Sequence, residues 1–355
     1  MARLCGPRGV FVSNGEVYIA DSFNHRVRKV LRNGQIVTIA GTGIQGYNGD
    51  GQLATNAQLH TPCSVIVSSS DQVYISELFG HRIRKIDQHG IISTIAGTGI
   101  QGYNGDGQLA VNAQLYFPCG LFVTEDEEVL IADSSNYRVR KIDRHGIITT
   151  IAGTGNYGFD GDGGLATSAK LSNSRSIFQY KNEIYIGDFG NNRIRKIDQN
   201  GIISTIAGTE NMVVDAMFVH NDEVYFTDSK SLVFKILPNG SVKIISGINN
   251  EEEFNGGDML ATQCKLNFPK GIFVDNDSQV YIADTENHCI RKIDQNGMMR
   301  NVIGTACNPG YSDDVPFDFE KYPHIGPRKK QLIKPFAPAY HDLIVICLEM
   351  DSLNQ

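Results

Sequence analysis

Clusters of arginine and lysine recur along the chain at fixed distances behind an acidic residue. The clusters are Arg26, Arg28 and Lys29; Arg82, Arg84 and Lys85; Arg138, Arg140 and Lys141; Arg193, Arg195 and Lys196; and Arg291 with Lys292. One interpretation is a ring of cations that binds phosphate or an acidic partner. The other is that each arginine pairs with the acid five or seven residues before it. The net charge of -7 favours pairing.

The pairing interpretation names specific partners. We expect Asp21 to pair with Arg26 or Arg28, Asp133 with Arg138 or Arg140, and Asp188 with Arg193 or Arg195. Such pairs would lie within one blade or between neighbouring blades. The acidic composition also argues against a general polyanion binder.

A second set of residues precedes the first apolar run of each repeat. Its members are Arg8, Cys63, Cys119, Arg175, Asp215 and Lys270. If the apolar runs line a central channel, these residues form a mildly positive rim at its mouth. Such a rim could bind a carboxylate, a phosphate or an acidic loop of a partner. The alternative is a set of solvated loop residues.

Other candidate sites have weaker support. His25, His81 and His288 share one position of the repeat but fall on separate blades, so we expect them to pack in turns and not to bind one metal ion. Asp50 and Asp106 each stand alone in a glycine loop, where calcium requires several ligands. The first apolar runs, such as GVFV and SVIV, carry no His, Asp or Glu. We therefore expect neither a metal, a cofactor nor an enzyme.

Seven cysteines are scattered over the chain without a CxxC pair. This odd number indicates neither a zinc site nor a disulfide framework. No apolar run has the length of a signal peptide or a membrane span. The expectation from these observations is a soluble, cytoplasmic protein.

Repetition predicts the architecture that holds these residues. The acid at the end of a tyrosine-containing apolar run recurs as Asp21, Glu77, Asp133, Asp188, Asp228 and Asp284, at spacings of 56, 56, 55, 40 and 56. Each copy has four short apolar runs joined by turns such as Asn14-Gly15, which is typical of antiparallel hairpins. Six four-stranded copies predict an all-β, six-bladed β-propeller over residues 1–305. Residues 306–355 form a C-terminal extension, either docked on the propeller or part of a further domain.

The segments ADSFNHRVRKV, ADSSNYRVRKI, GDFGNNRIRKI and ADTENHCIRKI resemble the core of NHL repeats. The long repeat, with GTGIQGYNGDGQLA between blades, is similar to the extended NHL repeats of teneurin-type proteins. The resemblance implies a six-bladed propeller. It permits RNA binding through the basic clusters, and it permits an enzyme with metal ligands around the channel, which the apolar runs disfavour.

The glycine-rich insert between blades predicts a loop capped by Asp50 or Gly51, followed by a short helix with Leu53, Ala54 and Ala57 on one face. Further copies cover Tyr103–Leu115, Phe159–Leu171 and Phe254–Leu266, whereas the 40-residue spacing leaves none between the fourth and fifth blades. We expect the inserts to wedge between outer blade edges, and ring closure to depend on side-chain packing and on any help from the extension. The function predicted from the sequence is a monomeric, non-enzymatic platform for a protein or peptide partner.

Overall fold

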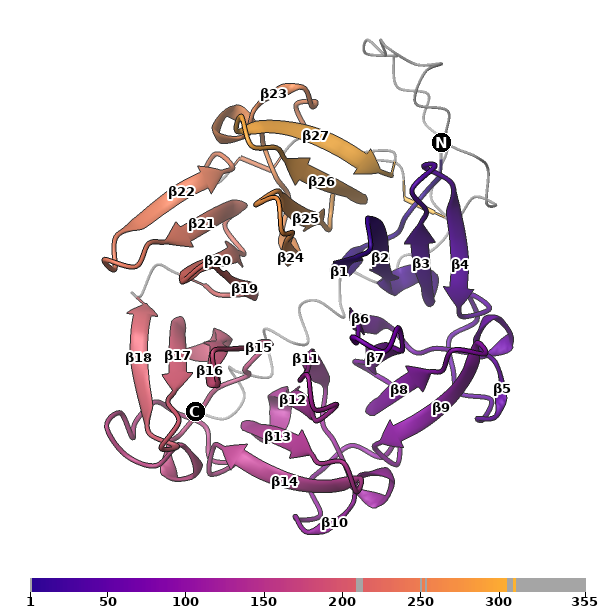
Figure 1. Cartoon of the computed structure of the whole chain (residues 1–355), viewed down its shortest axis with the longest axis vertical. Helices are drawn as coiled ribbons and strands as arrows, with labels where there is room; N and C mark the ends of the chain where they lie inside the picture. Colours follow the sequence, from indigo (N-terminus) through magenta and orange to yellow (C-terminus); the bar gives the residue numbers. More distant parts are fainter. Residues whose placement is uncertain (1, 209–212, 250, 253, 305–308, 311–355) are drawn as a thin grey trace. The chain divides into compact units, whose positions relative to one another are not determined.

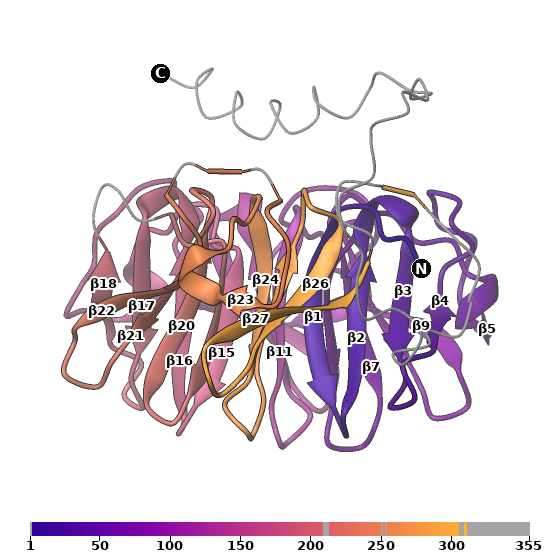
Figure 2. The same cartoon turned by 90° about the horizontal axis from the view of Figure 1, so that it is seen from above.

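The structure, a computed structural model, describes residues 2–208, 213–249, 251–252, 254–304 and 309–310. Six antiparallel sheets surround a central axis (Figure 1), which confirms the predicted all-β, six-bladed propeller. Seen from the side, the blades form a disc whose strands run from one face to the other (Figure 2). The ring belongs to a compact unit spanning Met1–Phe317; a second unit, Asp318–Gln355, lies outside the described residues, as does most of the predicted extension.

Each blade has four consecutive strands, the first next to the axis and the fourth at the periphery. Blades 1 and 2 consist of β1 (Pro7–Ser13), β2 (Glu16–Asp21), β3 (Arg26–Val30), β4 (Ile36–Ala40), and β6 (Pro62–Val67), β7 (Val73–Glu77), β8 (Arg82–Ile86), β9 (Ile91–Ala96). Blades 3 and 4 consist of β11 (Pro118–Val123), β12 (Val129–Asp133), β13 (Arg138–Ile142), β14 (Ile147–Ala152), and β15 (Ser176–Tyr180), β16 (Glu183–Asp188), β17 (Arg193–Ile197), β18 (Ile203–Gly208). Blades 5 and 6 consist of β19 (Ala216–His220), β20 (Glu223–Asp228), β21 (Leu232–Ile236), β22 (Val242–Ser246), and β24 (Pro269–Val274), β25 (Val280–Asp284), β26 (Cys289–Ile293), β27 (Met298–Ile303).

Alternating Val, Ile and Tyr side chains cover both faces of each sheet, so every blade must pack against two neighbours. The core accordingly consists of clusters shared between blades. One cluster joins Ala20 and Val27 of blade 1 with Val65 and Ile75 of blade 2, all buried. The disc therefore has no single core but a series of similar interfaces around the axis.

The predicted inserts lie at the periphery between blades. Three contribute a two-residue strand to the outer edge of the next blade, and these strands are β5 (Gln52–Leu53), β10 (Gln108–Leu109) and β23 (Met259–Leu260). A single 3₁₀ turn follows in four inserts, as η2 (Ala54–Asn56), η3 (Ala110–Asn112), η5 (Ala166–Ser168) and η7 (Ala261–Gln263).

Two details of the predicted insert are wrong. Neither Asp50 nor Gly51 caps the turn, because Leu53 occupies the cap position without a side-chain hydrogen bond, and the Asp50 carboxylate pairs with Arg84 instead. Leu53 also does not share the buried face of Ala54 and Ala57, since its side chain is 50% exposed. A 3₁₀ turn of three residues is too short to present an α-helical face.

Short 3₁₀ turns also follow the acid of three blades, as η1 (Ser22–Asn24), η4 (Ser134–Asn136) and η6 (Phe189–Asn191). Each ends at a left-handed residue, which is His25, Tyr137 or Asn192. The His25 ring crosses to the next blade, where its Nδ1 accepts the Thr61 N–H at 3.2 Å, and His81 accepts the Phe117 N–H at 3.3 Å. These histidines thus connect blades.

The ring closes with the same contacts. The hydroxyl of Thr285 in blade 6 donates to the Pro7 carbonyl of blade 1 at 2.7 Å, as Ser22 does to Pro62 at the next junction. The Gly6 N–H donates to His288 Nδ1 at 3.1 Å. Closure thus adds hydrogen bonds between side chains of blade 6 and the backbone of blade 1 to the expected side-chain packing. Gly310 of the predicted extension also takes part, since its N–H donates to the Leu4 carbonyl at 3.3 Å.

The bridging histidine makes one pH-dependent prediction. Burial, with the nearby His60 and Arg26, lowers the pKa of His25 from 6.5 to about 4. The unfolded chain therefore binds a proton more readily than the folded chain between pH 6.5 and 4, so this group destabilises the fold as the pH falls through that window. The variant His25→Asn should not show this loss of stability at low pH. Asparagine suits the position, because Asn192 of blade 4 has the same left-handed conformation.

The expected difference between the two proteins at pH 4, relative to pH 7, is up to about 3 kcal/mol in the free energy of unfolding. Urea titrations at both pH values measure it. An identical pH dependence in wild type and variant would contradict the role assigned to His25.

No helix in the described parts of the chain is long and apolar enough to cross a membrane.

Candidate interaction surface at the channel mouth

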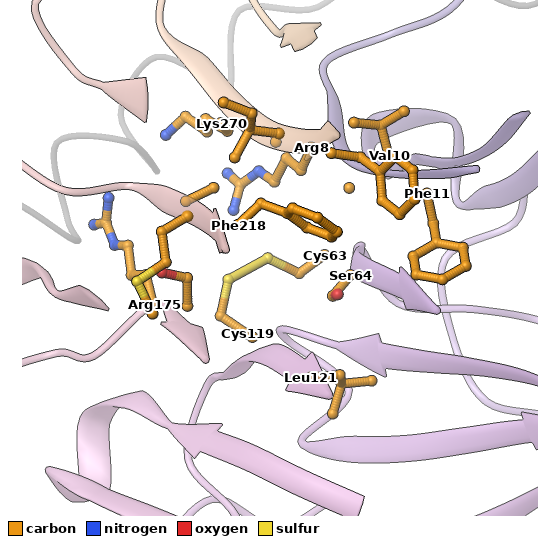
Figure 3. Close-up of a pocket in the computed structure, with 18 of the residues that line it drawn as sticks. Arg8, Val10, Phe11, Cys63, Ser64, Cys119, Leu121, Arg175, Phe218 and Lys270 are labelled. Atoms are coloured by element: carbon orange, nitrogen blue, oxygen red, sulfur yellow. A yellow bond between two sulfur atoms is a disulfide. The ribbon is translucent and has the colours of Figure 1, made fainter. Parts of the chain in front are cut away.

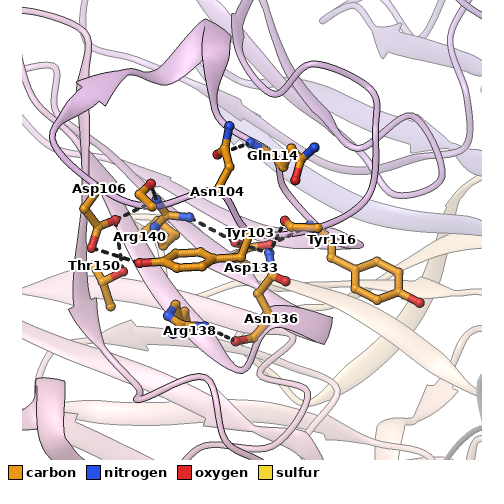
Figure 4. Close-up of polar contacts among 12 residues, drawn as sticks. Tyr103, Asn104, Asp106, Gln114, Tyr116, Asp133, Asn136, Arg138, Arg140 and Thr150 are labelled. Atoms are coloured by element: carbon orange, nitrogen blue, oxygen red, sulfur yellow. Dashed lines mark hydrogen bonds and ion pairs between the residues drawn. The ribbon is translucent and has the colours of Figure 1, made fainter.

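The basic clusters hold the inserts, as blade 3 shows (Figure 4). Arg140 is fully buried, and its guanidinium lies between two acids, 3.4 Å from Asp133 of the same blade and 2.7 Å from Asp106 of the insert. The Thr150 hydroxyl donates to Asp106 at 3.2 Å. The Tyr103 ring of the insert covers this guanidinium, 4.9 Å from its centroid. We call this set the arginine clamp.

The clamp recurs around the ring. The arginine seven residues after the acid is fully buried in five blades, as Arg28, Arg84, Arg140, Arg195 and Arg291. An aromatic residue of the insert covers the later four, as Tyr47, Tyr103, Phe159 and Phe254. In blades 2, 3 and 4 this arginine also pairs with an aspartate of the insert, whereas Arg291 binds the insert through the Lys265 carbonyl at 2.8 Å.

Of the two arginines in each cluster, only the second lies close to the acid with which pairing was predicted. The structure places Arg28 3.7 Å from Asp21, Arg140 3.4 Å from Asp133 and Arg195 4.0 Å from Asp188. Their neighbours bind backbone carbonyls instead, with Arg26 on Thr42 at 2.6 Å and Arg138 on Thr154 at 2.7 Å. Arg193 donates to the Asn191 carbonyl and lies under Phe159. The first arginine of each cluster thus shapes the turn, while the second belongs to the clamp.

Burial dominates the titration of the clamp acids. It raises the pKa of Asp21 to about 7 and the pKa of Asp133 and Asp188 to about 6, although hydrogen bonds and the adjacent arginines oppose this shift. Asp133, for example, accepts the Tyr116 N–H at 2.7 Å and the Asn136 amide at 2.8 Å. These acids are structural groups, held by several donors at once.

The lysines of the basic clusters also have partners within the fold. Lys141 lies 3.0 Å from Glu128, Lys196 lies 2.8 Å from Glu183, and Lys29 pairs with Glu16. Together with the buried arginines, these pairs leave little of the repeated positive charge for a polyanion. The arrangement does not favour the RNA-binding alternative.

The channel mouth is built by the first residues of the innermost strands. Successive first strands approach each other closely here, because a glycine follows the rim residue in three blades, as Gly9, Gly120 and Gly271. A Cβ on Gly271 would lie 2.1 Å from the Arg8 carbonyl oxygen of the neighbouring blade. A small residue at this position is what allows the six rim side chains to surround one opening.

Phenyl rings narrow the channel beyond the rim. Phe122, Phe178, Phe218, Phe273 and Phe11 follow each other around the axis, with neighbouring ring centroids 4.4 to 4.8 Å apart. The rim residues and these phenylalanines together line a cavity of about 100 Å³ (Figure 3). This is well below the roughly 300–1,000 Å³ of typical small-molecule sites. The cavity has room for a side chain or a single anionic group.

The structure brings all six predicted rim residues to this mouth. Arg175 pairs with the buried Asp215 of the next blade at 2.6 Å and lies over the Phe189 ring. Arg8 lies 5.6 Å from the centroid of Phe23. Burial, together with the positive charges of Arg8 and Arg175, lowers the pKa of Lys270 to about 8, although Asp215 opposes this shift. Three cations thus share the mouth with one anion, which suits an incoming anionic group.

Cys63 and Cys119 form a disulfide across the mouth between blades 2 and 3, with Cα atoms 5.5 Å apart (Figure 3). The sequence predicted no disulfide framework and did not identify this single bond. The two residues occupy one position of the repeat on adjacent blades, and the convergence of innermost strands brings them together. Their separation of 56 residues, equal to the repeat period, was the available signal.

Among the described residues, no group of three or more His, Cys, Asp or Glu side chains is placed to hold a metal ion. The sequence also did not identify the aromatic residues of the inserts as partners of the buried arginines. Their spacing was visible, because Tyr47 and Asp50 precede Arg84 by the same intervals as Tyr103 and Asp106 precede Arg140. Only the sheet register shows that these segments meet.

Sequence comparison finds relatives that contain NHL repeats. Residues 43–103 and 239–312 match the teneurin NHL domain, and residues 4–30 match the NHL repeat. Human teneurin-4 is 26% identical over 87% of this chain, and human NHL repeat-containing protein 2 is 24% identical over 89%. The chain spans 11% of the length of teneurin-4 and 42% of that of the second relative.

Solved structures share the architecture. Virginiamycin B lyase from Staphylococcus aureus superposes with a TM-score of 0.53 at 16% identity, covering 84% of this chain and 86% of the other. A chain of the nidogen/laminin complex superposes with a TM-score of 0.55 at 11% identity, covering 79% and 89%. At these identities the likeness concerns the fold alone, and the two neighbours differ in function.

Proposed function

Because this chain is an NHL-repeat propeller, we propose that it acts as a non-enzymatic interaction platform whose channel mouth receives an acidic group of a protein or peptide partner. The observation that carries the proposal is the presence of Arg8, Arg175 and Lys270 in the lining of a small cavity that phenylalanines also line. Placing several partly buried cations close together lowers the stability of a fold. Such clusters are therefore typical of binding sites.

The geometry suits a protruding group of a partner better than a free metabolite. The cavity is small and opens at the face of the disc, so a glutamate, an aspartate or a chain-terminal carboxylate can reach it while the rest of the partner lies on the surrounding loops. Arg175 is already oriented by Asp215, and Arg8 by Phe23, which reduces the side-chain entropy lost on binding.

Reversing the charge of the mouth tests the proposal. Full-length protein and the double variant Arg8→Glu/Lys270→Glu are immobilised and exposed to an extract, with Arg144→Glu/Arg300→Glu as a control of equal charge change away from the mouth. Partners should be retained by wild type and control but lost from the mouth variant by about tenfold or more. Equal retention by all three proteins, or retained material that a nuclease removes, would contradict the proposal.

The pH dependence of partner binding gives a second readout. Lys270 loses its proton as the pH rises through about 8, so affinity for an anionic group should fall above that pH. The decline should approach about tenfold per pH unit, because binding then requires the uptake of one proton. Lys270→Arg keeps its charge and should flatten the profile. A profile that is the same in both proteins would exclude Lys270 from the site.

A further inference from the structure

The outer edge of blade 5 differs from that of every other blade. Its fourth strand, β22, begins at Val242, whose register partner on β21 is Ile236. The residues at this register position in the other blades are fully buried, as Ile36, Ile92, Ile148, Ile203 and Met299. Val242 is 43% exposed, and Ile244, two residues further on the same strand, is 50% exposed.

The inserts explain the burial of this position in blades 2, 3, 4 and 6. In blade 2, the Gly51 N–H donates to the Ile92 carbonyl at 2.9 Å, and the Ala54 N–H donates to the Gly90 carbonyl at 2.8 Å. The same two bonds recur in blades 3, 4 and 6. Each of these blades thus has its outer edge extended by a short stretch of antiparallel chain.

Blade 5 receives no such stretch from the described residues, and its preceding connection comprises only residues 209–215. The carbonyls of Gly240 and Val242 occupy the places of the two acceptors. An uncovered strand edge of this kind pairs readily with an extended peptide.

Side chains at this edge have changed together with the missing insert. The arginine of the clamp is replaced by Phe234, which is stacked on Phe226 with ring centroids 4.9 Å apart. Its cross-strand neighbour is Ile244, where blades 2 and 3 have Thr94 and Thr150 bound to the aspartate of the insert. A polar clamp for an aspartate has thus become an apolar surface.

We propose that β22 is a docking site for an extended segment of a partner protein, which pairs antiparallel with the strand as the inserts do elsewhere. The segment would be apolar where three of the four inserts carry aspartate, because it faces Phe234 and Ile244 instead of an arginine. The four inserts bound to the other blades provide the template for its backbone. This site lies on the periphery and is independent of the channel mouth.

The test uses the full chain and a capped nonapeptide, GLGQLAVNA, which copies residues 105–113 with leucine in place of Asp106. We expect saturable binding, with slowed hydrogen exchange confined to residues 240–246. The control peptide GLGQLPVNA lacks the N–H aimed at the Gly240 carbonyl and should bind about tenfold more weakly. The unmodified copy GDGQLAVNA should also bind more weakly than the leucine peptide.

Three protein variants locate the site. Ile244→Glu should weaken binding of the leucine peptide about tenfold or more. Ile244→Thr introduces the residue that blades 2 and 3 have at this position, and it should weaken peptide binding without disturbing the strand. Ser93→Glu places the same charge on the covered outer strand of blade 2 and should leave the affinity for the leucine peptide unchanged. Arg8→Glu/Lys270→Glu should bind the peptide like wild type, so failure of the mouth proposal would leave this result intact.

The contrary outcomes are equally specific. No saturation by about 1 mM peptide, or protection on β9 or β14 in place of β22, would overturn the proposal. A concentration-dependent dimer that Ile244→Glu abolishes would show that the occupant is a second copy of this chain.

Discussion

Replacing Arg140 with methionine is expected to lower the free energy of unfolding by about 3–5 kcal/mol, because it removes one partner of a buried ionic cluster. Methionine fills much of the volume under Tyr103 but leaves Asp133 buried without its cation, and it releases Asp106 of the insert. Urea denaturation gives the loss. Hydrogen exchange should show the largest increase in residues 97–117, the insert that this arginine attaches.

Two controls identify the cause of that loss. Arg138→Met removes a cation that also lies against Tyr103 but binds carbonyls, so its effect should be smaller. The pKa of Asp133, already about 6, should rise further in Arg140→Met. Since a raised folded-state pKa stabilises the protonated form, the loss should be smaller at pH 5 than at pH 7.5. A loss that does not vary with pH would contradict the ionic explanation.

Removal of the disulfide should produce the second large effect. The bond between Cys63 and Cys119 spans 56 residues. Cross-links of such length restrict the unfolded chain, and their loss typically costs about 2–4 kcal/mol. We therefore expect Cys63→Ser/Cys119→Ser to unfold at lower urea concentration than wild type under oxidising conditions.

Reduction provides the matched control for this variant. A reductant should bring the wild type to the stability of the double variant and leave the variant unchanged. Non-reducing peptide mapping should recover the two cysteines in one cross-linked fragment. Recovery of both as free thiols from protein purified without reductant would contradict the bond.

The disulfide also bears on the compartment expected from the sequence. Scattered cysteines without a framework suggested a reducing cytosol, and a bond between two of them removes that support. Disulfides persist mainly in oxidising compartments. The redox state of Cys63 and Cys119 in protein isolated from its native source would decide between the two environments.

The repeat period and the hairpin turns were sufficient to predict the six blades, because each blade repeats the same local pattern. The rim could also be predicted, since its residues hold one place in that pattern. The clamp could not, because Tyr103 and Arg140 are distant in sequence and meet only through the pairing of β10 with β14. The open edge of blade 5 likewise depends on register, which places Val242 where other blades bury isoleucine or methionine.

The junctions of the ring are mechanically unequal. Blades 2 and 3 are joined by an insert at the periphery and a covalent bond near the axis. Between blades 4 and 5, the described residues provide ion pairs instead, Arg175 with Asp215 at 2.6 Å and the exposed Lys181 with Asp222 at 2.7 Å. Salt screens the exposed Lys181–Asp222 pair strongly and the largely buried Arg175–Asp215 pair much less, and it leaves a disulfide untouched. Under rising ionic strength or applied force, the disc should therefore loosen first beside the very strand that is open to a partner.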